Sequence, residues 1–137
     1  MSLRFTTAML ADAAQVQAGK LYVLGGGFDT ITARSLPAVH RNLALVLVAV
    51  VAPEDRHRDL EITIRLIDED GAAIGIEAKG KLRVGAPPNL APGASSTVPM
   101  VSSFANVQFP DAKGYAFSVM FEGSELARVP FRVVLAG

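Results

Sequence analysis

The residues of this chain that could do chemistry begin with a glycine run, Gly25-Gly26-Gly27, which is followed by Phe28 and Asp29. A glycine-rich turn binds a nucleotide phosphate when a strand precedes it and the N-terminus of a helix follows it. The sequence after Asp29 is Thr-Ile-Thr-Ala and soon reaches Pro37, and this β-branched pattern does not predict a helix. The glycine run therefore does not predict a phosphate site, and we expect no cofactor.

A structural role for the glycine run follows from the residues before it. Alternating apolar residues predict a hairpin, and its turn places Asp12 opposite Leu24 or Gly25. Because Asp12 has mostly apolar neighbours, we expect it to be buried, and a buried carboxylate needs a partner. We predict that it accepts hydrogen bonds from the backbone of the glycine run, with Arg34 or Arg4 as the alternative ionic partner.

Phe28 and Asp29, directly beyond the glycine run, are the candidate ligand-binding residues. An aromatic ring and a carboxylate at the rim of a hollow can orient a small polar molecule. The sequence therefore carries one binding hypothesis, a small-ligand or carbohydrate-binding module at the end of the molecule that holds Gly25 to Asp29.

The serine and histidine residues do not form a recognisable catalytic set. Ser124 lies in Glu-Gly-Ser-Glu-Leu, which lacks the second glycine of a nucleophile elbow, and a strand is expected after it where the elbow needs a helix. The two histidines, His40 and His57, stand beside arginines and not beside an acid that could orient a catalytic base. We expect a non-enzymatic protein without catalytic residues, with a hydrolase of unfamiliar type as the alternative.

Acidic residues gather in Asp68-Glu69-Asp70, directly before Gly71. A calcium-binding EF-hand loop needs further ligands up to an acid at its twelfth position, and Ala72-Ala73-Ile74 supplies none. The second acidic group, at residues 54–59, lies at the opposite end of the strand expected between the two groups. We therefore expect charged turns and no metal site.

Composition limits the classes of partner. The chain has 137 residues, of which 13 are basic and 13 acidic, so it lacks the positive field that attracts nucleic acids. Its longest apolar run, Leu43–Ala52, is about half as long as a membrane-spanning helix, and Thr6–Leu10 is too short and polar for the core of a signal peptide. We expect a cytoplasmic protein that binds neither nucleic acid nor membrane.

Period-two alternation of apolar and polar residues predicts an all-β fold. The clearest strand is Leu60–Leu66, whose apolar residues alternate with Glu61, Thr63 and Arg65. About eight such segments and no helix predict one domain, residues 1–137, folded as an antiparallel two-sheet β-sandwich that is immunoglobulin-like or similar. An eight-stranded barrel is the alternative. Residues 85–96, rich in proline and small residues, predict a surface loop.

The two ends of the chain also predict strands. Residues 4–17 and 20–32 are expected to form the two strands of the N-terminal hairpin. In the last strand Pro130 is expected to face outward, which suits an edge strand because proline has no N–H to donate. The residues of this strand expected in the core are Val129, Phe131, Val133 and Leu135.

The run from Leu43 to Val51 is apolar on both faces of its predicted strand, with leucines on one face and mainly valines on the other. A strand of a sandwich normally has one face in solvent, so the second face needs a cover. The loop at 85–96 or another subunit could supply it. We expect another subunit, which makes Val46, Val48 and Val50 the candidate oligomer face of a homo-oligomer or of a complex with another protein.

Two stretches of the first 30 residues resemble a known family. They are Leu10–Val16, LADAAQV, and Gly19–Asp29, GKLYVLGGGFD. In these stretches the chain resembles a family of uncharacterised bacterial proteins that is classed as a domain of unknown function. The resemblance implies a small all-β cytoplasmic domain and implies no catalytic residue.

Overall fold

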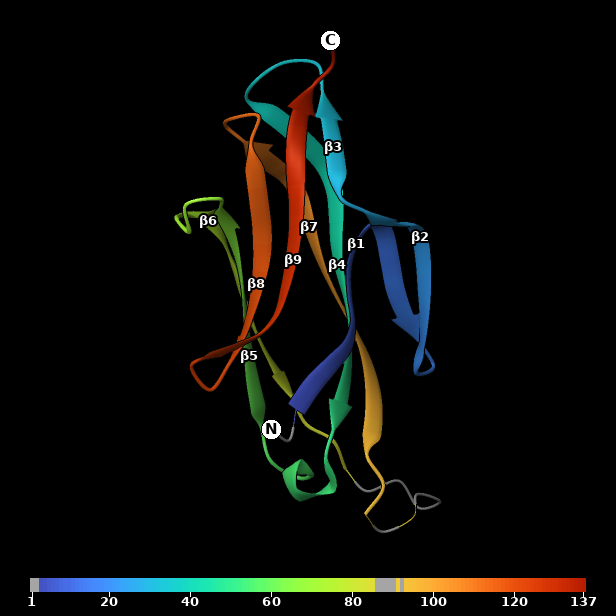
Figure 1. Cartoon of the computed structure of the whole chain (residues 1–137). Helices are drawn as coiled ribbons and strands as arrows, with labels where there is room; N and C mark the ends of the chain where they lie inside the picture. Colours follow the sequence, from blue (N-terminus) through green and yellow to red (C-terminus); the bar gives the residue numbers. More distant parts are fainter. Residues whose placement is uncertain (1–2, 86–90, 92) are drawn as a thin grey trace.

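The computed structural model describes residues 3–85, 91 and 93–137, which form two β-sheets packed against each other (Figure 1). Sheet A has the strand order β2-β1-β4-β7, and sheet B has the order β3-β9-β8-β5-β6. Neither sheet closes into a barrel, so the predicted β-sandwich is confirmed and the barrel alternative is wrong. The strands are β1 (Leu3–Gln17), β2 (Lys20–Phe28), β3 (Thr30–Ala33), β4 (Ala38–Val51), β5 (Leu60–Asp68), β6 (Ala73–Leu82), β7 (Ser96–Phe109), β8 (Gly114–Phe121) and β9 (Ser124–Leu135).

The connections between the strands include a short helix after β4 and the predicted loop at residues 85–96. A 3-10 helix, η1 (Pro53–Asp55), follows β4. Of the loop predicted at residues 85–96, residues 86–90 and 92 lie outside the described residues, and Ser96 already belongs to β7.

The core between the sheets is built from the side chains that alternation assigns to one face of each strand. The aromatic rings of this core join the two sheets, since Phe104 of β7 stacks on Phe117 of β8 with ring centroids 5.4 Å apart. Tyr115, at the start of β8, donates a hydrogen bond from its hydroxyl to the carbonyl oxygen of Asp111 at 2.8 Å, which satisfies its polar atom. In β5 the residues that the pattern assigns to the core are buried, namely Leu60, Ile62, Ile64 and Leu66, and Ile67 at the end of the strand is buried as well.

Strand β1 divides between two partners. Its first half, from Leu3 to Ala11, pairs with β4, and its second half, from Leu10 to Gln17, pairs with β2. The hairpin turn consists of Ala18 and Gly19, both with positive φ, as a two-residue turn between twisted strands requires. Figure 1 shows the resulting hairpin at the side of the sandwich, with its turn directed toward the end of the molecule where the chain begins.

Strand β3 is an element that sequence analysis assigned to the hairpin. The pattern predicts one strand over residues 20–32, but the chain leaves β2 after Phe28 and crosses to sheet B. There β3 pairs in parallel with the end of β9, with Thr30 beside Arg132. The crossing is held by a hydrogen bond from the backbone N–H of Arg132 to the carbonyl oxygen of Asp29, at 2.9 Å. This extra strand brings the described strands to nine.

Strand β9 differs from the prediction at two residues. It is not an edge strand, because β8 pairs with one side of it and β3 with the other. The missing N–H of Pro130 is tolerated because the pairing with β3 begins only at Arg132. Leu135, predicted to be buried, is 48% exposed, since it is the last residue of the strand and lies beyond the packed core.

Candidate functional site

The glycine run lies where β2 follows a bend in β1. Leu10 pairs with Phe28 but Ala11 pairs with Gly26, so Gly27 is an extra residue in the ladder, with φ +83°. A side chain at Gly26 would also collide, since an added Cβ would lie 2.8 Å from Cγ1 of Val23. The run therefore forms a β-bulge in which neighbouring side chains leave no room for a Cβ at Gly25 and Gly26, and the positive φ of Gly27 favours glycine.

Asp12 lies opposite Gly25, because Ala11 pairs with Gly26 and Ala13 with Leu24. An added Cβ at Gly25 would overlap Oδ2 of Asp12 and lie 3.0 Å from its Cγ, so the carboxylate packs against bare backbone. Asp12 is nevertheless exposed, where the sequence predicted a buried carboxylate. The reason is that β1 leaves the sandwich after Ala11, so the next residues face solvent. Among the described residues Asp12 makes no hydrogen bond or ion pair.

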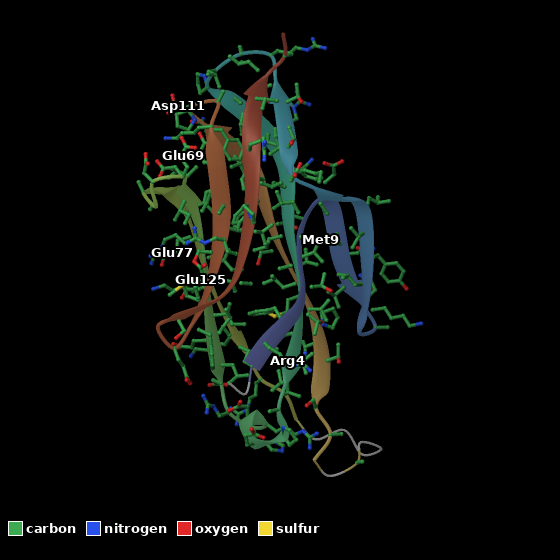
Figure 2. The ribbon with its side chains drawn as sticks, viewed as in Figure 1. Arg4, Met9, Glu69, Glu77, Asp111 and Glu125 are labelled. Carbon is green, nitrogen blue, oxygen red and sulfur yellow. The ribbon has the colours of Figure 1, made fainter. Side chains whose placement is uncertain are left out.

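The N-terminal hairpin folds over part of the outer face of sheet A, where it encloses a second small core. Ala11, Ala44 and Val46 are buried there, with at most 1% of each exposed. Figure 2 shows Met9 beside the hairpin. The partly buried residues around them come from β1, β2 and β7: Met9, Ala14, Leu21, Val23 and Val101.

This second core changes the candidate oligomer face. The valine face of β4 exists as predicted, but Val46 is covered by the chain's own hairpin, a cover that differs from the loop and the subunit that the sequence suggests. Val46 is therefore not accessible to a partner. Val48 and Val50 lie beyond that cluster and are half-buried, so the accessible part of the face is shorter than predicted.

Large apolar side chains also face outward on the hairpin itself. Tyr22 is 52% exposed and Leu24 is 73% exposed, and alternation places both on the face of β2 opposite Leu21 and Val23. We use the name contact surface for the outward apolar residues on the sheet A side of the molecule, which are Tyr22, Leu24, Val48 and Val50.

The outer face of sheet B has a different character. Charged side chains alternate with buried ones, and they pair across neighbouring strands: Lys81 Nζ lies 3.7 Å from Glu61 Oε1, and Arg65 Nε lies 3.5 Å from Glu77 Oε2. In Figure 2 the labelled acids Glu69, Glu77, Asp111 and Glu125 all lie on this side of the molecule. The basic residues of β5 and β6 on this face, Arg65, Lys79 and Lys81, therefore have acidic partners. Such paired charges are typical of a solvated sheet surface.

The structure separates the two candidate ligand-binding residues. Phe28 is half-buried and packs against the main core. Asp29 is exposed and lines a shallow surface groove of about 610 Å³ on sheet B. The sequence suggests that both residues lie at one rim, but only Asp29 lines the groove. Its other charged or ring-bearing lining residues include Lys113, Arg128, Pro130 and Arg132.

Two of the cations in this groove already have partners. Lys113 Nζ lies 3.2 Å from Asp68 Oδ2, and this hydrogen bond raises the pKa of Lys113. The pKa of Asp68 is lowered, first by the hydrogen bond that it accepts from the backbone N–H of Ala72 and further by Lys113. The pKa of Arg128 is raised by its hydrogen bonds to Glu125. Among the described residues Arg132 has no ion-pair partner, so it is the cation that a ligand in the groove would meet.

Asp55 is a buried acid that sequence analysis missed. It lies at the end of η1 with only 2% exposed, inside the group interpreted as a charged turn. Its Oδ1 lies 3.0 Å from Arg58 Nη1, and Nη2 of the same arginine lies 2.5 Å from Glu122 Oε1. Arg58 thus ties the segment after β4 to the turn between β8 and β9. The signal that could have found it is Pro53, which starts a helical turn that folds Asp55 inward.

The residues tested for catalysis and metal binding stay apart. His40 lies half-buried in β4, His57 is exposed after η1, and Ser124 is exposed at the start of β9. Within the described part of the chain, no three His, Cys, Asp or Glu residues are grouped so that they could hold a metal ion. None of the described helices has the length and apolar character to cross a bilayer.

Comparison with known proteins finds similar solved structures and a matching family. One of these structures is the alkylpurine DNA glycosylase AlkC of Pseudomonas fluorescens bound to DNA that contains an abasic site analog. The similarity covers 96% of this chain and 30% of that chain, with 10% identity and a TM-score of 0.47, and a likeness of this degree carries no argument about function. Comparison with curated proteins gives no match.

The family model matches residues 6–134, which include all the strands except the first residues of β1 and the last of β9. Its description is a family of unknown function, DUF6941. The prediction from the first 30 residues is thereby confirmed: the chain belongs to this family of unknown function, DUF6941.

Proposed function

We propose that this protein is a non-enzymatic β-sandwich that works through protein–protein contacts and forms a homo-oligomer through its contact surface. The observation that supports this most is the exposure of Tyr22 and Leu24 on the outer side of the hairpin, together with the partial exposure of Val48 and Val50 on the outer face of β4. Large apolar side chains grouped on one face of a soluble domain are typical of an interaction site.

The charges of the molecule favour a second copy as the partner. No Asp, Glu, Lys or Arg occurs in residues 42–52 or in β7, so two copies can bring these regions together without placing like charges opposite each other. The chain as a whole has a formal net charge of zero, which removes long-range repulsion between copies.

The test compares the self-association of the wild type with that of Val48→Lys. We expect the wild type to show a molar mass that rises with concentration in sedimentation equilibrium. Val48→Lys should shift this association to concentrations at least about tenfold higher, because a charge at the centre of an apolar interface must lose its hydration. A matched control is Met120→Lys, which places the same charge at a half-buried apolar residue on the outer face of sheet B.

Two results would contradict the proposal. One is a wild type that stays monomeric at every concentration, while Val48→Lys remains folded and soluble. The other is an equal loss of association in Val48→Lys and Met120→Lys, because the effect would then not depend on the face.

A second candidate function is the binding of a small anionic or polar ligand, which the groove beside Asp29 favours. Arg132 would supply the positive charge and Asp29 a hydrogen-bond acceptor. A thermal-shift screen of sugars, nucleotides and divalent metals tests this candidate. At 100 times its dissociation constant a true ligand should add about 2.7 kcal/mol to the free energy of unfolding, and Arg132→Gln should abolish the shift. A screen without any shift would leave only the protein-contact proposal.

A further inference from the structure

The free edge of β7 is a backbone feature that the contact surface does not include. One side of β7 pairs with β4 from Ser96 to Phe109, and no other strand in the described part of the chain pairs with its opposite side. An unpaired strand edge presents N–H and C=O groups that can accept another strand.

The sheets have four edge strands, and three of them are protected against such pairing. β6 carries charges at Glu77, Lys79 and Lys81, and β3 is only four residues long. β2 is interrupted by the bulge of the glycine run. β7, by contrast, extends over 14 residues without a single charged side chain. Charges, bulges and proline are the usual protection of sheet edges. Because β7 carries no charge, its segment between Pro99 and Asn106 is the stretch of edge best suited to pair with another strand.

Pro99 indicates which groups of β7 point to the free edge. Proline has no N–H, and it is tolerated in a paired strand where that N–H would point away from the partner. Residues of the same parity, such as Val101 and Ser103, then direct their N–H and C=O groups away from β4. The regular part of this edge runs from Met100 to Ala105, between Pro99 and Asn106, whose φ of +52° interrupts the extended backbone.

We propose that β7 pairs antiparallel with β7 of a second copy, so that two four-stranded A sheets join into one continuous sheet. The inference rests on the proposed function, since it takes the partner to be a second copy, and it adds an edge-to-edge contact that is separate from the contact surface. The uncharged sequence of β7 supports self-pairing, because a two-fold axis places identical residues near each other. The axis lies near Ser102 and Ser103, the middle of the regular segment.

Side chains on the core face of β7 give a second reason for this pairing. Val98, Met100 and Phe104 pack against the core but are only half-buried, because no other described strand lies beside the free side of β7 to cover them. A second β7 laid beside the first would cover the exposed parts of these side chains with its own. The pairing therefore combines backbone hydrogen bonds with the burial of apolar area.

The test uses two single variants of the full chain, Ser103→Lys and Ser103→Glu, and an equimolar mixture of them. Ser103 is exposed, so both variants should keep the fold, which circular dichroism and thermal unfolding check. Each variant alone should dissociate at a concentration at least about tenfold above that of the wild type, because like charges meet at the axis. The mixture should recover association as a one-to-one complex, because opposite charges then meet.

The outcomes separate this inference from the proposed function. Recovery in the mixture, together with a concentration-dependent slowing of amide exchange in the peptide that spans Val101 to Ala105, supports it. If both variants associate as the wild type does while Val48→Lys does not, the edge pairing is wrong and the contact surface remains. The edge pairing is also wrong if the mixture of Ser103→Lys and Ser103→Glu does not recover association. A wild type that is monomeric at all concentrations contradicts both proposals.

Discussion

The outer faces of the two sheets differ in how they meet solvent. On sheet B, charged residues alternate with core residues and pair across strands, as Arg65 does with Glu77. On sheet A, the outer face of β4 is apolar and is partly covered by the hairpin that the chain folds back over it. A sheet face that the chain covers itself needs no charges, and the uncovered remainder belongs to the contact surface that we propose for self-association.

The largest expected effect comes from breaking the cover of sheet A. Val46→Asp places a carboxylate in a site with no solvent exposure, among the apolar side chains of the second core. We expect it to lower the free energy of unfolding by at least about 4 kcal/mol, measured by urea denaturation. Met120→Asp, on the outer face of sheet B, should cost less than about 1 kcal/mol. Equal effects of the two substitutions would show that the hairpin does not exclude water from Val46.

A smaller effect is expected where the glycine run bends the hairpin. Gly25→Ala forces a side chain into a backbone with φ +64° and against the carboxylate of Asp12, which should cost about 1–2 kcal/mol in chemical denaturation. Gly80→Ala is the control on sheet B, because nothing lies within 4 Å of an added Cβ there. Adding Asp12→Ala to Gly25→Ala should recover part of the loss. No recovery in this double-mutant cycle would mean that the two residues are not in contact.

The smallest effect concerns the charges of sheet B. The folded-state pKa of Asp68 lies below its ordinary value of 3.8, so its carboxylate contributes stability above that pH and loses the contribution as pH falls through the folded pKa. We expect Asp68→Asn to be less stable than the wild type at pH 7 and the two proteins to converge in acid. Thermal unfolding between about pH 7 and pH 2 measures this. If the stability curves of the wild type and Asp68→Asn stay parallel over this whole pH range, the lowered folded-state pKa of Asp68 is contradicted.

Much of the fold could be predicted because alternation is a local property. Leu60–Leu66 alternates without interruption, and the structure buries the residues that the pattern assigns to the core. The double-sided run of β4 likewise predicted that its second face would need a cover. What covers it could not be predicted, because the cover depends on where β1 bends away from β4, and Leu10 and Ala11 carry no sequence signal of a change of partner.

The candidate site was less predictable for the same reason. The pairing of Asp12 with Gly25 follows from counting along a hairpin, whereas the exposure of Asp12 depends on the position of the hairpin outside the sandwich. Asp29 was chosen for its place beside the glycine run, but the groove that it lines is formed with β8 and β9. These strands are distant in sequence, and β3 brings Asp29 to them through a parallel pairing that alternation does not reveal.

The central claim, that the outer face of sheet A is the contact surface, is tested most directly by covalent side-chain labelling at low and high protein concentration, read by mass spectrometry. The account predicts that labelling of Tyr22, Leu24 and Val48 falls as concentration rises, while labelling of Met120 and Pro130 on sheet B stays constant. Unchanged labelling of the sheet A residues together with a fall on sheet B would contradict it.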